Sequence, residues 1–477
     1  MVVQHNISAM NANRMLGITQ GSLSKSTEKL SSGYKVNRAA DDAAGLSISE
    51  KMRKQIRGLD QASANAEDGI SAVQTAEGAL TEVHDMLQRM NELAVKASNG
   101  TMSLDDRQTV QDEVDQLLTE IDRVAETTKF NETYLLKGEK SSTAKTQYVN
   151  AHDAGIDGTL REGATKATLT ISKLKVGDTV TIGGTSYTIG DVKKTVVASV
   201  KAAMGATGTQ VTIDGVQYTV AGTAGEDEDK NILTSANIEN KITDNSSVTV
   251  GGKTYNVLAK NDNTGVNAND STIISANRAY ALMKEELTLA NNIGTDATVK
   301  NGAGKTATST SGLATIAEAK ESKTDTSKMD FVITKGQRNV TQALSFSLHV
   351  GADADANNKI TVGVDAMDTA GLGIKGLNVK DSTGSAATYA IDAIADAVAK
   401  VSAQRSALGA VQNRLEHTIN NLDNVVENTT SAESQIRDTD MADEMVKYSK
   451  NNILQQAGQS MLAQANQSNQ GVLSLLG

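Results

Sequence analysis

The sequence predicts an α+β protein: a long antiparallel α-helical coiled-coil rod formed by the N- and C-terminal segments, with a central β-hairpin-rich region. Two stretches at opposite ends of the 477-residue chain carry apolar residues at heptad spacing, which is typical of helices that pack along a seam. Between them, residues 139–340 alternate polar and apolar residues around repeated turn signals, which indicates hairpins. Because each heptad stretch needs a partner helix, we expect the two ends of the chain to pack on each other.

Residues 43–99 hold the longer heptad repeat. At 1.5 Å per residue they predict a helix about 85 Å long. The alanines and the single glycine in its seam require a partner that approaches closely. The seam consists of Leu59, Ala66, Val73, Leu80, Leu87 and Ala94 and, three residues after each, Ala62, Gly69, Ala76, Val83, Met90 and Ala97.

A second heptad stretch, near the other end of the chain, supplies the expected partner. Two polar residues, Arg405 and Gln412, occupy seam positions, where a single polar side chain can fix the register of two helices. The apolar positions are Ile391, Ile394, Val398, Val401, Leu408, Leu415, Ile419, Leu422 and Val426.

Capping signals set the ends of these helices. Asp41 and Asp42 predict the start of the long helix, and Asn99-Gly100 predicts its end. Ser103, with Asp106 three residues later, resembles a capping box and predicts a second helix that folds back along the first. The apolar face expected for this second helix consists of Val110, Val114, Leu117, Ile121, Val124 and Thr128.

The two extreme segments carry apolar residues that need a partner. Residues 1–42 carry Leu16, Leu23 and Leu30 at heptad spacing, but Ser, Thr and Gly separate them, so we expect this segment to be weakly ordered in a free subunit and to become helical only against other helices. Near the other terminus the apolar positions are Met441, Met445, Tyr448, Ile453, Ala457, Met461, Ala465, Val472, Leu473, Leu475 and Leu476. Such an apolar end on an acidic protein predicts burial against a neighbouring subunit.

The central region contains an internal repeat. The pattern Val-Thr-Ile/Val, a turn pair, and a strand with a Tyr begins at residues 180, 211 and 248. Each copy places Gly-Gly or Asp-Gly between two alternating runs, which is the strongest short hairpin signal because both turn residues need a positive φ. Residues 192–204 and 275–291 follow as expected short helices, and residues 344–350 and 359–364 predict a further hairpin.

Composition excludes several classes of protein. The chain has no Cys, Pro or Trp, and its formal charge of −11 argues against a nucleic-acid binder. No apolar run is long enough to span a membrane, and residues 1–8 show no basic leader followed by an apolar block, so we expect a cytoplasmic protein or one exported without a cleavable signal. The missing Pro and Cys suit continuous helices and rapid refolding after export.

Motifs for metal or phosphate chemistry are incomplete. The histidines His5, His84, His152, His349 and His417 form no zinc pair. Residues 252–254 and 304–306 read Gly-Lys-Thr, but the earlier glycine of a phosphate loop is absent from both, so we interpret them as turns. Asp353, Asp355 and Asn357 have the spacing of calcium ligands, yet Asn358 replaces the required Gly, which favours a plain hairpin loop. We expect no enzyme activity, no cofactor and no metal.

Several motifs at the two ends resemble those of bacterial flagellin. They are Leu30-Ser-Ser-Gly33, Asn37-Arg-Ala-Ala-Asp-Asp-Ala-Ala-Gly-Leu46, Ser49-Glu-Lys-Met-Arg53, Leu408-Gly-Ala-Val-Gln-Asn-Arg414, Ile453-Leu-Gln-Gln-Ala-Gly458 and Val472-Leu-Ser-Leu-Leu476. The resemblance covers about the first 138 and the last 130 residues. It implies an inner assembly segment at 1–42, rod halves at 43–138 and 341–434, a variable outer region at 139–340 and a second assembly segment at 435–477.

The resemblance implies a filament subunit for motility, secreted to the bacterial flagellum through type III export, with an export chaperone and a cap protein as partners. It implies an open helical homopolymer whose assembly residues include Leu16, Leu23, Leu30, Met461, Leu473, Leu475 and Leu476. It also implies recognition by Toll-like receptor 5 through Arg89, Leu93 and Glu113, with Asn91 standing where many members have Arg. Arg89 would offer a bidentate donor, and we expect Leu93 as an apolar knob on the surface one turn along. The alternatives are a hook-filament junction protein, a coiled-coil secreted adhesin, or an enzyme carried on the central region.

Overall fold

The computed structural model describes residues 6–139, 145–149, 154–205, 207–222, 225–258, 264–297, 299, 311–381 and 383–474, without the side chains of 145 and 469–474. The chain divides into two compact units. We call Met1–Ser71, Ser347–Val362 and Ala410–Gly477 the terminal unit, and Ala72–Phe346 with Gly363–Gly409 the central unit. The two long helices α2 and α8 contribute residues to both units.

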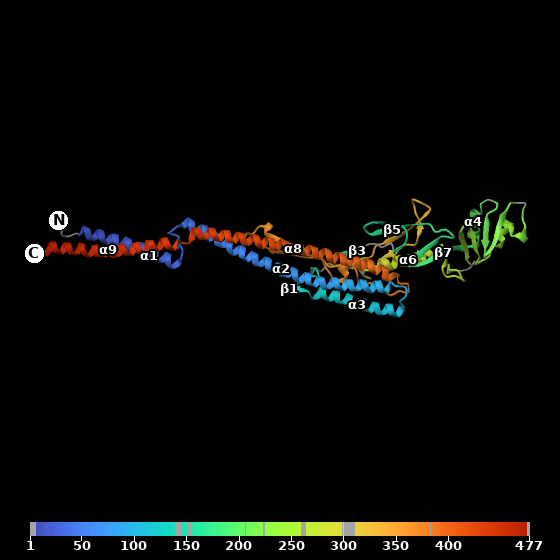
Figure 1. The fold of residues 1–477 in the computed structure, drawn as a ribbon, viewed down its shortest axis with the longest axis horizontal. Coiled ribbons are helices and arrows are strands. Elements are labelled where there is room, and N and C mark those ends of the chain that lie inside the picture. Colours follow the sequence, from blue (N-terminus) through green and yellow to red (C-terminus); the bar gives the residue numbers. More distant parts are fainter. Residues whose placement is uncertain are drawn as a thin grey trace. The chain divides into compact units, whose positions relative to one another are not determined.

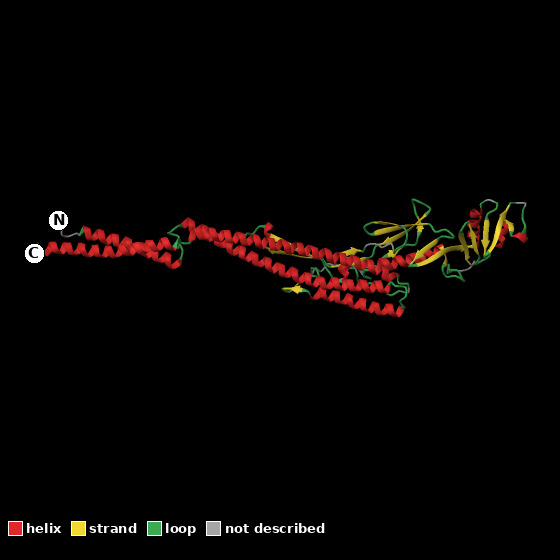
Figure 2. Cartoon of the chain, in the orientation of Figure 1, coloured by secondary structure: helices red, strands yellow, loops and turns green. Residues whose placement is uncertain are grey.

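The terminal unit is mainly helical (Figures 1 and 2). Its elements are α1 (Ile7–Ser32), the first part of α2 (Ala43–Ala97), residues 347–349 of strand β18 (Leu344–His349) and 359–362 of strand β19 (Lys359–Val364) with a 3-10 turn at Ala356–Asn358, the second part of α8 (Ser385–Arg437), and α9 (Met441–Ser474). Strands β18 and β19 bear out the hairpin predicted at 344–364.

The central unit combines helices with strands. Before the repeat region it contains α3 (Leu104–Thr127), β1 (Lys129–Phe130), β2 (Thr133–Tyr134), β3 (Lys145–Tyr148), β4 (Thr159–Glu162) and β5 (Lys166–Ser172). The repeat region contains β6 (Thr179–Ile182), β7 (Thr185–Val192), α4 (Lys193–Met204), β8 (Gln210–Ile213), β9 (Val216–Ala221), a 3-10 turn at Glu228–Lys230, β10 (Ile232–Thr234), α5 (Ser235–Lys241), β11 (Ser247–Val250), β12 (Lys253–Leu258), β13 (Ile273–Ser275) and α6 (Ala276–Asn292). After it come β14 (Thr315–Ile316), β15 (Lys320–Glu321), β16 (Lys328–Thr334), β17 (Gln337–Val340) and α7 (Thr369–Leu372).

The predicted heptad seam of α2 is buried along almost its whole length. Leu80, Val83, Leu87 and Met90 are each 0% exposed, and among the twelve seam residues only Leu59 is partly exposed. The α8 positions Ile394, Val401, Leu408, Leu415 and Leu422 are likewise buried. In the terminal unit α2 and α8 run antiparallel, because Ser49 meets Glu433 and, further along α2, Ala66 packs with Leu415. In the central unit they also run antiparallel, because Glu77 meets Arg405 and the chain after α2 at Ser98 lies beside Gly384 just before α8.

The structure corrects two details of the seam. The close approach predicted at Gly69 is made by Leu348 of β18, because the β18–β19 hairpin packs on α2 and α8 there. Of the two polar seam residues, Arg405 reaches Glu77 on α2 at 3.7 Å, whereas Gln412 donates to Glu416 along α8. Only Arg405 therefore links the two helices and can set their register.

The start of α3 follows its predicted capping box, since the Ser103 hydroxyl accepts from the backbone N–H of Asp106 and the Asp106 carboxylate accepts from that of Ser103. The buried face of α3 differs from the prediction. It is formed by Val110, Val114, Leu118, Ile121 and Ala125. We predicted Leu117 and Val124 on this face, and each prediction was wrong by one residue. A straight helix has 3.6 residues per turn, and a strict heptad repeat drifts off its buried face.

The end of α2 is held by a residue that the sequence analysis did not single out. The helix ends at Ala97, and the Arg107 guanidinium, which is 2% exposed, donates to the carbonyls of Ala97, Asn99 and Asp381. The bond to Ala97 satisfies a carbonyl that the end of α2 leaves without a partner, and the other two bonds hold loop carbonyls. Arg107 thus joins the end of α2 to α3 and to the loop before α8.

All three predicted repeat hairpins are present in one eight-stranded sheet. Its order is β10-β9-β8-β11-β12-β7-β13, with β6 paired to β7. The cross-strand pair is Val with Tyr in every copy: Val180–Tyr187, Val211–Tyr218 and Val248–Tyr255. The turn residues have positive φ, for example +55° at Gly183 and +75° at Gly184, as the turn type requires. The expected helices are α4 and α6.

A second sheet of the central unit contains β14, β16, β5 and β4, with β15 also paired to β16. Strands β5 and β16 pair over seven residues, and Leu169 and Phe331 face each other there with 0% exposure. The remaining pairs are β1–β2 and β17–β3.

Candidate assembly and binding surfaces

The terminal helices α1 and α9 lie side by side, the blue and red helices that carry the N- and C-labelled ends in Figure 1. Leu16, Leu23 and Leu30 of α1 are half-buried, and a Cβ on Gly458 of α9 would lie 3.3 Å from the Leu16 side chain. The Asn6 amide also donates to the carbonyl of Ala465 at 3.0 Å. In the single chain residues 7–32 already form a helix, and its partner is α9 of the same chain, whereas we expected weak order in a free subunit.

A polar contact lies in the same seam. Ser26 is 4% exposed and Glu444 is 5% exposed. Burial opposes ionisation of the Glu444 carboxyl, but hydrogen bonds from the Ser26 hydroxyl and the Lys447 ammonium outweigh it and lower the pKa of Glu444. The seam thus contains a buried, hydrogen-bonded charge, which favours one register of α1 against α9.

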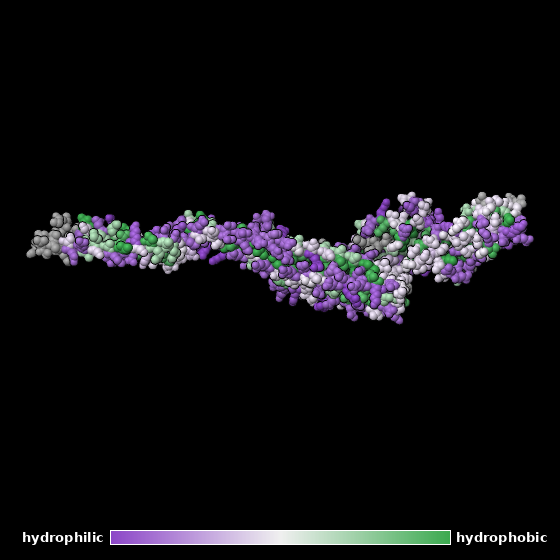
Figure 3. All heavy atoms as spheres, in the orientation of Figure 1, coloured by the Kyte–Doolittle hydropathy of each residue, from purple (hydrophilic) through white to green (hydrophobic). Residues whose placement is uncertain are grey.

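The two helices keep many large apolar side chains on their outer faces. The described residues include 21 exposed large hydrophobic side chains, and ten of them belong to α1 and α9. Ile7 and Ile18 lie eleven residues, or three turns, apart and face away from the leucine seam. Hydrophobic atoms are visible on this helix pair in Figure 3. The ten residues are Ile7, Met10, Met15, Ile18, Met441, Met445, Val446, Ile453, Leu454 and Met461.

The chain segments that connect α1 to α2 and α8 to α9 pair with each other. The backbone N–H of Lys35 donates to the carbonyl of Arg437 at 2.6 Å, and that of Thr439 donates to the carbonyl of Gly33 at 3.0 Å. The Arg437 guanidinium lies 4.5 Å from the centroid of the Tyr34 ring, a cation–π distance. These contacts therefore join the α1–α2 connector to the α8–α9 connector at the base of the α1–α9 pair.

The assembly residues expected from the resemblance fall into three groups. Leu16, Leu23 and Leu30 lie in the seam between α1 and α9, whereas Met461 is 62% exposed on the outer face. The side chain of Leu473 and all of Leu475 and Leu476 lie outside the described residues. The outer residues of α1 were missed, although the eleven-residue spacing of Ile7 and Ile18 is visible in the sequence.

A second exposed surface lies where α2 packs against α3. Arg89 of α2 forms ion pairs with Glu113 of α3 at 2.9 Å and with Glu92 at 3.0 Å. The side chains of Arg89 and Glu113 are 52% and 45% exposed. Leu93 is only 3% exposed, so it packs beneath this pair and is not the surface knob that we expected.

The residues considered for metal or phosphate chemistry serve as turn and capping residues. The Asp355 carboxylate accepts from the backbone N–H of Asn357 and caps a 3-10 turn in the β18–β19 hairpin loop. Gly252 lies in the β11–β12 turn with a φ of +82°, and Lys253 and Thr254 begin strand β12. The second Gly-Lys-Thr run, at 304–306, lies outside the described residues, as do His5 and His152. In the part of the chain that is described, no three His, Asp or Glu side chains form a metal-binding group.

None of the described helices has an apolar stretch long enough to cross a bilayer. Polar residues separate the exposed apolar positions along both helices, apart from the adjacent pairs Met445–Val446 and Ile453–Leu454 of α9.

Comparison with known proteins shows which family the sequence matches. Residues 3–141 match the bacterial flagellin N-terminal helical region, and residues 391–476 match the bacterial flagellin C-terminal helical region. The flagellin of Clostridium tyrobutyricum is 38% identical over 98% of this chain and 100% of its own length. The flagellin of Halalkalibacterium halodurans is 32% identical over 100% of both, and that of Salmonella typhimurium is 35% identical over 98% of this chain and 99% of its own.

Two solved structures are more distant. FliC from Burkholderia pseudomallei is 18% identical with a TM-score of 0.24, covering 72% of this chain and 99% of that one. The flagellar junction protein FlgL from Legionella pneumophila is 15% identical with a TM-score of 0.31, covering 82% and 99%. At these TM-scores the likeness carries no argument about fold or function.

Proposed function

Since the chain belongs to the bacterial flagellin family, we propose that it is a structural subunit that polymerises, through the outer faces of α1 and α9, into the flagellar filament that drives motility. The observation that carries this proposal is the ten exposed large apolar side chains on those two helices. The family is one of structural proteins, and we assign the chain no enzymatic role.

Physical chemistry favours burial of these faces between subunits. Fully burying one Ile, Leu or Met side chain contributes about 1.5–3 kcal/mol. Ten such residues on two helices provide a large driving force for association, and Met side chains adapt to irregular contacts. A contact made between different faces of successive copies does not close on itself and generates an open helical polymer.

Two truncations test the polymerisation. A chain without residues 1–42, and one without residues 435–477, should remain soluble and keep the helical circular dichroism of α2, α3 and α8, but should not elongate filament seeds. The full chain should elongate the same seeds and give filaments in electron micrographs. Seeded growth by either truncated chain would contradict the proposal.

Export of the chain fits its composition. With no Pro and no Cys, refolding after passage through a type III apparatus would meet no slow prolyl isomerisation and no disulfide step. The exposed apolar face of α9 is a surface that a chaperone would cover before export, and a cap protein would shield it during assembly. We therefore propose an extracellular, flagellar location with these two partners.

We also propose that the Arg89–Glu113 surface binds Toll-like receptor 5, as the family resemblance implies. The half-exposed guanidinium of Arg89 would exchange one of its ion pairs, with Glu113 or with Glu92, for a bidentate pair with a carboxylate of the receptor. Leu93 would support this surface from beneath, since it is buried.

Binding of the receptor ectodomain to two variants tests this role. Arg89→Ala should weaken binding at least tenfold without changing the melting temperature, because Arg89 is exposed. Leu93→Ala should lower both binding and stability. Arg123→Ala, an exposed arginine of α3 paired with Glu120, is the matched control and should bind like the wild type. Unchanged binding by Arg89→Ala would exclude this surface.

A further inference from the structure

One arginine of the central unit is buried without a carboxylate partner. Arg338 of β17 is 6% exposed, and its Nε has no hydrogen-bond partner among the described residues. Its Nη2 donates to the side-chain oxygen of Gln147 at 3.3 Å. Burial lowers the pKa of Arg338, which means that the surroundings leave its charge poorly solvated.

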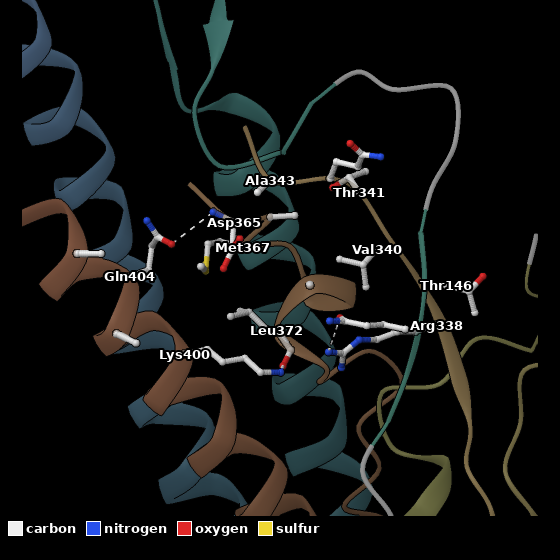
Figure 4. A pocket seen from close by; sticks show the side chains of 16 residues that line it. Thr146, Arg338, Val340, Thr341, Ala343, Asp365, Met367, Leu372, Lys400 and Gln404 are labelled. Carbon is white, nitrogen blue, oxygen red and sulfur yellow. Dashed lines mark hydrogen bonds between the residues drawn. The ribbon is translucent and has the colours of Figure 1, made fainter. Parts of the chain in front are cut away.

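A second cation approaches the same point. Lys400 of α8 donates from its ammonium to the carbonyl of Leu372 at 2.8 Å. Both Arg338 Nη1 and Lys400 Nζ lie within 3.5 Å of the position that a Cβ on Gly373 would occupy. Lys400 as a residue is exposed, but partial desolvation of its ammonium and the charge of Arg338 lower its pKa. Figure 4 shows the two side chains extending toward Leu372 from opposite sides.

Nearby carboxylates are engaged elsewhere. Asp296 pairs with Lys375 at 2.6 Å and accepts from the backbone N–H of Asn339, and Asp368 caps α7. Within the described ranges, neither Arg338 nor Lys400 has a carboxylate oxygen within 4.0 Å. Two like charges held together in this way are stabilised by an added anion.

The two cations line a cavity of about 780 Å³. Gln147, Gln404 and the carboxyl residue Asp365 supply polar groups to its wall, while Met367, Leu372 and Ala403 supply apolar surface. This volume exceeds what an inorganic anion needs and is within the range of small-molecule sites. The wall therefore carries the two cations Arg338 and Lys400, an apolar side and one carboxyl group, Asp365.

We propose that this cavity binds a small organic anion, with its acid group held by Arg338 and Lys400 and its apolar part packed against Met367, Leu372 and Ala403. An arginine fork suits either a carboxylate or a phosphate monoester, and the lysine adds a point charge. This site is independent of the assembly surface of the terminal helices and of the Arg89–Glu113 surface.

Isothermal titration calorimetry of the full chain with four probes tests the proposal. Hexanoate and hexyl phosphate carry both the acid group and the apolar part, and at least one of them should bind with a stoichiometry of one. The stronger of the two identifies the acid group. Inorganic phosphate should bind at least tenfold more weakly, and hexan-1-ol should show no saturable binding. Binding of hexan-1-ol as tight as that of the acids, or no binding of either acid, would overturn the proposal.

Variants assign the site to its residues. Lys400→Gln should weaken acid binding about tenfold while leaving the urea unfolding curve close to that of the wild type. Arg338→Lys should retain more affinity than Arg338→Gln, because it keeps the charge. Lys194→Gln changes an exposed lysine on α4 and should bind like the wild type. Equal affinity in Lys400→Gln and the wild type would contradict the assignment.

Discussion

Replacing Ile453 by Ala should raise the critical concentration for filament growth while leaving the monomer intact. Ile453 lies on the outer face of α9 and is 66% exposed. Full burial of an isoleucine contributes about 1.5–3 kcal/mol, so a side chain that is two-thirds exposed retains about 1–2 kcal/mol for a neighbouring copy. Since 1.4 kcal/mol is a tenfold change in an equilibrium constant, the critical concentration should rise about five- to thirtyfold.

Seeded growth followed by sedimentation measures the critical concentration, and thermal unfolding followed by circular dichroism measures the monomer. The monomer should change by less than about 0.5 kcal/mol, because the substituted side chain is exposed. Val216→Ala, which removes an exposed apolar group from the tip of the β8–β9 hairpin, is the matched control and should assemble like the wild type. An unchanged critical concentration for Ile453→Ala would refute the reasoning.

Three further substitutions probe the central unit through urea unfolding. Arg107→Met should lower the free energy of unfolding by about 2–4 kcal/mol, because the buried guanidinium loses its bonds to the buried carbonyl of Ala97 and to the part-buried carbonyls of Asn99 and Asp381. The exposed control Arg123→Met should change it by less than about 0.5 kcal/mol. Leu87→Ala should cost about 2–5 kcal/mol, since Leu87 is 0% exposed in the helix seam; a cost below 1 kcal/mol would argue against that packing. Burial raises the pKa of the Glu286 carboxyl, although the Tyr389 hydroxyl donates a hydrogen bond to it. The folded chain therefore binds the carboxyl proton more tightly than the unfolded chain does. The free energy of unfolding consequently falls as the pH rises above 4.5, the ordinary pKa of Glu. Glu286→Gln should flatten that slope, and an unaltered slope would exclude Glu286 as its source.

Local rules in the sequence predicted much of this fold. The heptad positions of α2 predicted its buried seam, because spacing along one helix fixes which residues share a face. The Asp-Gly and Gly-Gly pairs predicted the three hairpins, because few residues adopt positive φ. Ser103 and Asp106 predicted the start of α3 through contacts only three residues apart.

These local rules did not predict contacts between residues far apart in the sequence. The repeat pattern does not predict the pairing of β8 with β11 or of β7 with β12 and β13, because these pairings depend on packing of the whole sheet. The partner of Gly69 and the clamp formed by Arg107 also join residues far apart in sequence.

The candidate surfaces were predicted in part. Heptad spacing drew attention to Leu16, Leu23 and Leu30, which face α9, whereas the outer face of α1 has the eleven-residue spacing of Ile7 and Ile18. Leu93 was expected at the surface because it follows Arg89 by one turn of helix. It is buried, because the spacing along α2 does not reveal which side of that turn α3 covers.

Oxidation of methionines by hydroxyl radicals, read by mass spectrometry in monomer and filament, tests the central claim most directly. Met10, Met15, Met441, Met445 and Met461 are 49–66% exposed in the single chain, whereas Met90, Met204 and Met283 are 0–2% exposed and serve as internal controls. Burial of the outer faces of α1 and α9 between copies predicts that the five exposed methionines react readily in the monomer and at least tenfold more slowly in the filament. Equal rates in the two states would contradict assembly through these faces.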